Sequence, residues 1–369
     1  MAERRLRDAP LWCCGFRPFF LGAALWAALA MLLWMPMLAG WLPMATAPLP
    51  GPAWHAHELV WGFGMAAVTG FLLTAVPEFT STAAFTPRDT AALFGLWLAA
   101  RLLGLGVAPP WLAALPNLAL VIWLAARIAP RLLRQPERPH LGFGLAVAAL
   151  ALLEAGFWWD TLRGGAAMRW VNALVGVMMV LIVLAQSRIS MRLLHGMLDH
   201  LGVHEVDYRA PPPRRRLAVF CIALATAAEL LGTAPSTTGW LALATAAAVL
   251  ALMTDWHLGR ALLHRWVWPM YAVYVGMAAG FALLGLAWLG APWPPSAGHH
   301  LLTVGGMGLG VLAVMNIAGR IHAGRPLDDR RWRIVATLLL AGAAVARALA
   351  GTPLAGAAVS WWWWAAALL

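Results

Sequence analysis

Two pairs of histidines stand where long apolar stretches of this sequence begin. The first pair, His55 and His57, lies in "WHAHELVWGFG" with Glu58 directly behind it, and the second, His299 and His300, opens "HHLLTVGGMGLG". Neutral imidazole is the commonest protein ligand for metal ions and also binds haem iron. Polar side chains at membrane depth are costly, so they usually face a bundle interior or serve a function. A single interfacial histidine needs no ligand to explain it, but two pairs at the start of two separate stretches favour ligation.

Helix geometry separates the two histidines of the first pair. An α-helix turns about 100° per residue, so His55 and Glu58 share a face while His57 points about 200° away from His55. Two helical histidines in this arrangement cannot reach one metal ion, so either His55 belongs to the entering loop or the two histidines serve different partners. Glu58 could accept a hydrogen bond from a ligating imidazole and fix its orientation, as carboxylates beside metal sites do. Its alternative role is that of a carboxylate near a helix N-terminus, stabilised by the helix dipole.

The second pair belongs to a stretch with histidines near both ends. On a continuous α-helix, His300, Met307 and His322 lie within about 40° of one another. The rise from His300 to His322 is about 33 Å, close to the thickness of one bilayer core. One helix face would then carry a ligand at each membrane surface. Glycines in this stretch either let helices pack closely or leave room for a flat macrocycle; they are Gly305, Gly306, Gly308 and Gly310.

The remaining polar residues give weaker signals. His195, His200 and His204 occur in "HGMLDHLGVHEVD", which we interpret as a solvated loop, although His200 and His204 have the i, i+4 spacing of a divalent metal site on a helix. Glu154 and Glu229 are placed near the ends of apolar stretches, where snorkelling to the interface explains them. The sequence contains no GxSxG, P-loop or HExxH motif, so no catalytic nucleophile or nucleotide site is predicted.

The elements that must position the histidines are membrane helices. Of the 369 residues, 62% are apolar and 11% are charged, whereas soluble domains carry about 25% charged residues. The mean hydropathy is +0.74, and apolar stretches long enough to cross a bilayer recur along the chain. The sequence predicts an all-α, polytopic transmembrane helix bundle that forms one integral membrane domain over residues 1–369, with about twelve spans. Their approximate limits are 19–41, 55–76, 89–107, 111–133, 140–159, 168–194, 215–232, 238–257, 267–290, 299–320, 331–350 and 353–369.

The distribution of charge predicts the orientation of these spans. All 26 Lys or Arg positions hold arginine, and the net charge is +11. Most of the arginines fall in the N-terminal segment and in alternate connections, which are cytoplasmic by the positive-inside rule. An even number of spans then places both termini in the cytoplasm and "TAPLPGPAWHAH" outside. This pattern reflects membrane topology and excludes a nucleic-acid-binding surface. The three cysteines have no CxxC spacing and are interpreted as free.

Three stretches of the sequence resemble the NnrS family, which comprises polytopic membrane proteins that contain haem and copper and act in the bacterial response to nitric oxide. The stretches are "GFRPFFLGA" at 15–23, "WHAHELVWGFGMAAVTGFLLTAVPEFT" at 54–80, and "HHLLTVGGMGLGVLAVM" with "HAGRPL" in the region that ends at residue 327. The resemblance implies a multi-pass protein of the bacterial inner membrane that relieves nitrosative stress, often beside denitrification.

The resemblance also implies which residues bind the cofactors. The family's histidines fall on His55, His57, His300 and His322, with Glu58 beside them. These residues would hold haem, expected to be of b-type, and copper. Nitric oxide or a related small molecule is the implied substrate or ligand. Membrane lipid surrounds the helices, and the sequence does not identify an electron donor.

Some positions depart from the family pattern. Ile317 stands where the family tends to carry an arginine, and only Arg188 remains of a motif that follows the sixth span. A histidine usual in the ninth span is replaced within "PMYAVYVGMAAG". A second, architectural likeness is to haem–copper oxidases, which also place haem ligands on their second and tenth helices. Because the sixth and seventh predicted spans here lack the histidines that hold the oxidase copper, the likeness implies no oxidase activity.

Three hypotheses from different classes of function follow. The first, which we favour, is a protein that binds haem and copper and acts on nitric oxide or its products, with the iron as reactive centre or electron carrier. The second is a membrane transporter or metal-delivery protein in which the same histidines handle a cation in transit. The third is an assembly partner without a cofactor. An absorption spectrum with metal analysis discriminates between them.

Overall fold

Helices make up every regular element in the part of the chain that this computed structural model describes, which is residues 10–41, 49, 51–200, 212–327 and 330–368. The α-helices are α2 (Phe16–Leu38), α3 (Gly51–His57), α4 (Gly64–Thr80), α5 (Pro87–Leu102), α6 (Pro110–Leu133), α7 (Leu141–Arg163), α8 (Met168–His200), α9 (Pro212–Leu230), α10 (Pro235–Leu250), α11 (Trp268–Trp288), α12 (Pro295–His300), α13 (Leu309–Ile321), α14 (Trp332–Leu349) and α15 (Val359–Leu368). Three π-helices, η2 (Glu58–Phe63), η3 (Leu103–Val107) and η5 (Leu301–Gly308), and two 3₁₀-helices, η4 (Ala251–Leu263) and η6 (Pro353–Ala358), join them.

Within the described residues, ten helical stretches are long and apolar enough to cross a membrane. The chain is therefore a multi-pass membrane protein with an all-helical fold. Each of the twelve predicted ranges contains helix, but two of them hold no qualifying stretch. One is 215–232, where α9 carries the arginines 214–216 in its first turns, and the other is 353–369, where α15 has only 10 residues. The number of spans and the side on which each terminus lies stay predictions.

Proline and capping residues explain where several helices begin. Pro87, Pro110 and Pro235 occupy the first turn of α5, α6 and α10, where the missing N–H would have no helical partner. Before α5, Thr86 and Asp89 form a reciprocal capping box. The turns that connect these helices are thus encoded locally, and packing then arranges the helices.

The predicted loop after residue 194 is partly helical instead. α8 continues to His200, because the backbone through "HGMLDH" keeps its helical hydrogen bonds and Gly196 is tolerated within it. His195 donates from Nδ1 to the carbonyl oxygen of Met191, one turn earlier, at 2.7 Å. His204 lies outside the described residues.

Two of the π-helical segments follow directly on the predicted ligand histidines. η2 begins immediately after His57 and η5 immediately after His300. A π-helix bonds i to i+5, so it does not advance by the 100° per residue of an α-helix. The predicted common face of His300, Met307 and His322 assumed a continuous α-helix, and η5 interrupts that helix between the first two of these residues.

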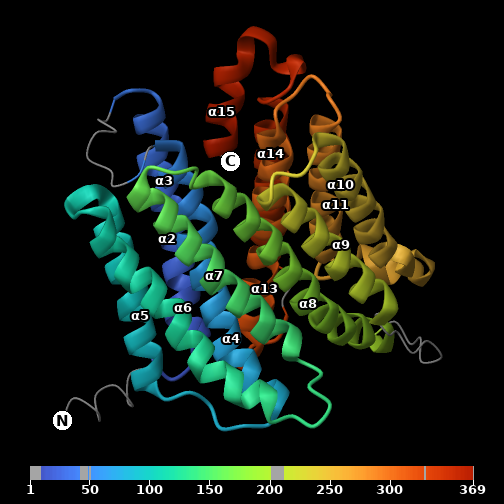
Figure 1. Cartoon of the computed structure of the whole chain (residues 1–369). Coiled ribbons are helices and arrows are strands. Elements are labelled where there is room, and N and C mark those ends of the chain that lie inside the picture. Colours follow the sequence, from blue (N-terminus) through green and yellow to red (C-terminus); the bar gives the residue numbers. More distant parts are fainter. Residues whose placement is uncertain (1–9, 42–48, 50, 201–211, 328–329, 369) are drawn as a thin grey trace. The chain divides into compact units, whose positions relative to one another are not determined.

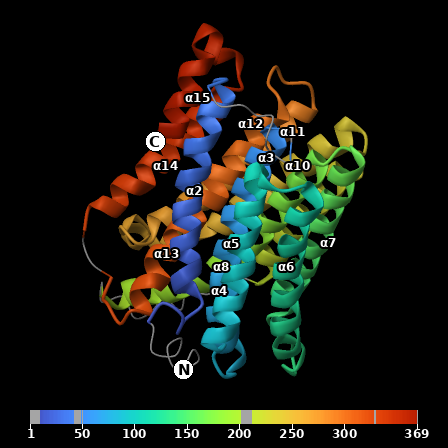
Figure 2. The same cartoon turned by 90° about the vertical axis from the view of Figure 1, so that its left-hand side faces the viewer.

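The chain divides into two compact units, residues 1–174 and 175–369, and each is described separately. In the first unit, α2 packs on α4, α6 packs on α5 and α7, and α4 also contacts α6. In the second unit, α10 packs on α9 and α11, and α11 and α14 both pack on η5. Figures 1 and 2 show the helices of each unit running alongside one another.

The glycines of η5 serve helix packing in the second unit. A Cβ atom on Gly276 of α11 would lie 2.6 Å from the carbonyl oxygen of Gly305, and one on Gly306 would lie 3.0 Å from both Met179 Sδ and Met277 Cγ. Of the two explanations offered by the sequence, close helix packing is therefore the one that these contacts support.

Gly276→Ala is expected to destabilise the protein by about 1–3 kcal/mol, because backbone atoms of η5 must move to admit the methyl group. Reversible unfolding in mixed micelles measures the change. Gly319→Ala in α13 is the matched control, since its Cβ would meet nothing within 4 Å; it should be neutral or stabilising by about 0.5–1 kcal/mol. Equal effects of the two substitutions would contradict the packing role.

Candidate functional site

His57 lies at the centre of a buried polar cluster in the first unit. Its side chain is 1% exposed. Its Nε2 atom is 3.0 Å from Oε1 of Glu154, and its Nδ1 atom is 3.4 Å from Oε1 of Glu58. One face of the imidazole stacks on Phe157, with ring centroids 4.4 Å apart and an interplanar angle of 13°. Both ring nitrogens of His57 are therefore directed at carboxylates.

Glu58 connects this histidine to a buried arginine. Arg101 in α5 is completely buried and donates from Nη1 to Oε2 of Glu58 at 2.5 Å. Its Nη2 atom donates to the side-chain oxygen of Asn117 in α6, and Asn117 in turn donates to the carbonyl oxygen of Ala113 at 3.0 Å. Because Glu58 is the eighth residue of the helical stretch that starts at Gly51, the helix-dipole explanation of this carboxylate is wrong.

Glu154 closes the cluster from α7. It is also completely buried, and it accepts a hydrogen bond from the Trp158 indole at 2.7 Å as well as contacting His57. The interpretation of Glu154 as a helix-end residue that snorkels is wrong, because it lies near the middle of Leu141–Arg163. Its position four residues before Trp158 places both side chains on one face of α7.

Two glycines and two indoles shape the backbone around the ion pair. A Cβ on Gly62 would lie 2.5 Å from Nη1 of Arg101, and one on Gly104 would lie 3.1 Å from Oε1 of Glu58. The indole of Trp97 donates to the carbonyl oxygen of Gly62 at 2.8 Å, and the indole of Trp54 donates to that of Gly104 at 2.9 Å. The π-helices η2 and η3 thus expose carbonyl groups that tryptophans from the neighbouring helix satisfy.

Charge balance explains why these residues occur together. Glu58 and Arg101 neutralise each other, and an imidazolium at His57 would neutralise Glu154. Buried charges persist where they are paired and hydrogen-bonded, since an isolated ion in a low-dielectric interior is very costly. The cluster of His57, Glu58, Arg101, Asn117 and Glu154 is called the buried charge cluster below.

The other predicted ligand of the first unit points elsewhere. His55 stacks on Trp34 of α2, with ring centroids 4.5 Å apart and an interplanar angle of 18°, and it is only partly buried. His55 and His57 are both helical and stack on side chains of different helices, which agrees with the predicted separation of their directions. That they serve different partners stays a prediction.

The second unit holds the remaining predicted ligands. His300, partly exposed, donates from Nδ1 to the carbonyl oxygen of Ser296 at 2.7 Å. A carbonyl oxygen can only accept, so the neutral ring carries its lone pair on Nε2. The adjacent His299 instead approaches Glu229 of α9, with Nε2 and Oε1 3.2 Å apart. His322 is partly exposed and follows the last residue of α13.

These environments decide how well each histidine fits a haem or metal. His57 fits poorly, because both of its nitrogens and one ring face are engaged. His300 fits well, since a carbonyl bond to Nδ1 is the usual way in which proteins orient a ligating imidazole. In the described ranges no three His, Cys, Asp or Glu side chains form a group that could hold a metal ion. His55 and His300 belong to different units, so their convergence on one cofactor stays a prediction.

The fold and the buried charge cluster define the class of protein to which this chain belongs. This is a polytopic helical membrane protein with paired histidines on two π-interrupted helices and a charge cluster buried among the helices of its first unit. Residues 10–369 match the family described as NnrS protein, and the chain belongs to this family. No curated protein and no solved structure shows significant similarity to it.

Proposed function

We propose that this protein is a haem-binding protein of the bacterial inner membrane that acts in the response to nitric oxide. The match to the NnrS family over nearly the whole chain carries the proposal. His300 is the first candidate ligand, and His55 is the candidate from the first unit. His322 is assigned to a second site, and copper remains part of the set of cofactors that the family resemblance implies.

The chain's own residues support this assignment of roles. The bond from His300 Nδ1 to Ser296 fixes the ring and directs Nε2 away from the helix backbone. His55 is held against Trp34, and the buried charge cluster anchors the same helical stretch two residues further on, at His57. When bound, haem would supply a reducible iron that coordinates nitric oxide. The helices would orient the ligating imidazole and exclude water from the iron.

The test is an absorption spectrum of purified protein from haem-replete cells. We expect a Soret band that shifts on reduction with dithionite, and loss of at least most of this band in His300→Ala. His299→Ala is the matched control, because this neighbouring histidine contacts Glu229 instead, and it should retain the band. The same variants, expressed in cells exposed to nitric oxide, should rank in the same order for growth.

Three results would count against the proposal. A colourless, metal-free preparation of wild-type protein would remove haem binding altogether. A wild-type band that is equally strong in His300→Ala would remove this residue from the ligand set. Uptake of a divalent metal by proteoliposomes, in protein without stable haem, would replace the proposal with a transporter that uses the same histidines.

A further inference from the structure

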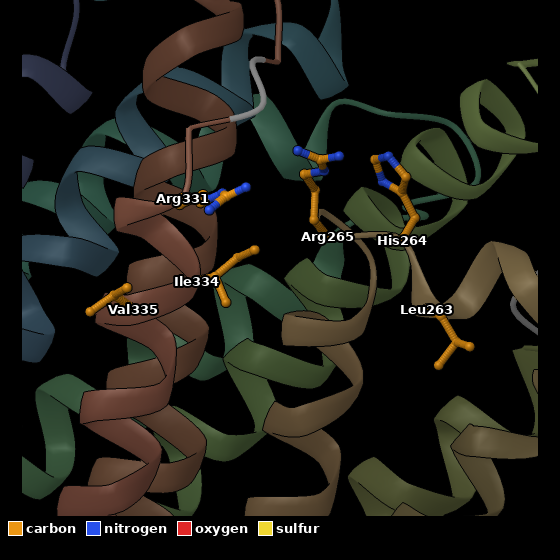
Figure 3. A pocket seen from close by; sticks show the side chains of 6 residues that line it. All are labelled: Leu263, His264, Arg265, Arg331, Ile334 and Val335. Carbon is orange, nitrogen blue, oxygen red and sulfur yellow. The ribbon is translucent and has the colours of Figure 1, made fainter.

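A half-open pocket of about 570 Å³ lies in the second unit where η4 leads into α11 and where α14 begins. It is lined by Leu263, His264, Arg265, Arg331, Ile334 and Val335. Figure 3 shows Arg331, Arg265 and His264 at one level and the three apolar side chains below them. The pocket therefore has a cationic end and an apolar end.

The pocket stands at the boundary between the apolar spans and the polar connections. Arg265 precedes the first residue of the span Trp268–Trp288 by three positions, and Arg331 directly precedes the span Trp332–Leu349. Tryptophan concentrates at this level of a membrane protein, and Trp266, Trp268 and Trp332 all occur here. This is the depth at which lipid headgroups lie, whichever side of the membrane the pocket faces.

The pocket is held in shape by a buried arginine. Arg333 in the first turn of α14 is 5% exposed and donates from Nη2 to the carbonyl oxygen of Arg265 at 3.2 Å. Its guanidinium stacks over the ring of Trp266 at 3.1 Å, and Trp266 packs with Met270 and Ile317 in a core cluster. The two walls of the pocket are thus fixed to each other, although they are far apart in sequence.

The chemistry of the lining selects an amphiphilic anion. Guanidinium groups bind phosphate oxygens in a bidentate manner, and Arg265 and Arg331 each place one guanidinium in the lining of the pocket. Backbone N–H groups at the start of α14 add positive potential on the same side. The apolar wall continues along α14 as the exposed side chains Val335, Leu338 and Leu339, which suit an acyl chain. Asp328 and Asp329, in the connection before α14, lie outside the described residues.

We propose that this pocket binds an anionic phospholipid, with the headgroup phosphate between Arg265 and Arg331 and an acyl chain along Ile334 and Val335. Basic pockets between membrane helices at headgroup level are sites of this kind. The inference does not depend on haem, because none of the lining residues is a candidate ligand.

Native mass spectrometry of the full chain in detergent tests the proposal, with dioleoyl phosphatidylglycerol, dioleoyl phosphatidylcholine and inorganic phosphate added separately. Phosphatidylglycerol should be retained on wild-type protein, and Arg265→Gln/Arg331→Gln should retain about tenfold less. The matched control is Arg134→Gln/Arg330→Gln, which removes the same charge from two exposed arginines outside the pocket; it should bind as wild type does. Arg265→Lys/Arg331→Lys should recover part of the binding, because charge returns without the bidentate fork.

Each contrary outcome has a defined meaning. Equal retention of phosphatidylcholine would overturn the role of the arginines, and so would equal loss in both double glutamine variants. Displacement of the lipid by inorganic phosphate at the same concentration would show a simple anion site without an acyl component. Loss of haem from Arg265→Gln/Arg331→Gln with unchanged lipid retention would show that the pocket serves the cofactor. Gel filtration and circular dichroism of each variant establish that it is folded.

Discussion

Arg101→Met is expected to lower the free energy of unfolding by about 3–5 kcal/mol, the usual cost of removing one partner of a buried ion pair. Methionine approximates the volume of the arginine stem, so the loss comes mainly from charge. Glu58 would be left as a buried carboxylate whose Oε2 atom has lost a donor at 2.5 Å, and Asn117 would lose its partner as well. Reversible unfolding in mixed micelles measures the effect.

Two further variants distinguish the ion pair from general damage. Arg134→Met, at an exposed position where α6 ends, should change stability by no more than about 0.5 kcal/mol. Glu58→Gln/Arg101→Met should recover much of the loss, since it removes the uncompensated charge. If the double variant loses as much stability as Glu58→Gln and Arg101→Met lose together, Glu58 and Arg101 are not energetically coupled. The ion pair between them would then not stabilise the fold.

His57→Ala is the second variant for which a large effect is expected, again about 3–5 kcal/mol of lost stability. The substitution removes the imidazole that contacts both Glu58 and Glu154, and it leaves a cavity against Phe157. Because both nitrogens of His57 are occupied by carboxylates, the folded fraction of this variant should keep the haem that we propose for the wild-type protein. The Soret absorbance per folded molecule and the unfolding free energy are measured on the same preparation.

The alternative prediction for His57 is equally definite. A residue that ligates iron would give a folded, nearly normally stable protein without a Soret band when it is changed to alanine. Adding Glu154→Gln to His57→Ala should restore part of the lost stability, because the neutral amide no longer needs a cation. That rescue has no reason to occur if His57 acts only on the cofactor.

Composition and periodicity were sufficient to predict the class of fold. Apolar stretches bounded by proline, glycine and arginine predicted an all-helical membrane protein, and helix is present in each predicted range. The family resemblance, drawn from 15–23, 54–80 and the stretch ending at 327, is confirmed by the match over residues 10–369. These sequence patterns are local, so they can be recognised without knowing which helices are neighbours in the fold.

The buried charge cluster could not be predicted in the same way. Arg101 carried no site prediction, and Glu154 was placed near the end of its span, because a charged residue there is most simply explained by snorkelling. Their partners come from other helices, 43 residues away for Arg101 and Glu58 and 97 residues away for Glu154 and His57. The available signal was depth, since Glu154 and Asn117 lie about two helical turns or less from the ends of the predicted ranges 140–159 and 111–133 but still within them, and polar residues inside a span need partners.

The helical wheel assumes a geometry that this chain keeps only in part. It predicted a common face for His300, Met307 and His322 from α-helical geometry, and η5 changes the geometry directly after His300. For His55 and His57, which precede η2, the same arithmetic gave the correct separation. Nothing in the residue types of "LLTVGGMG" distinguishes a π-helix from an α-helix.

The paired indole bonds between η2 and η3 make the two π-helical turns depend on each other. Trp97 precedes η3 and donates to Gly62 in η2, while Trp54 precedes η2 and donates to Gly104 in η3. If one π-helical turn relaxed into ordinary α-helix, its carbonyl group would move away from the indole that donates to it. The indole N–H, which belongs to the other helical stretch, would then be left without an acceptor in a region without water. The two turns should therefore straighten together or remain wound together, as a single cooperative switch in the helical backbone.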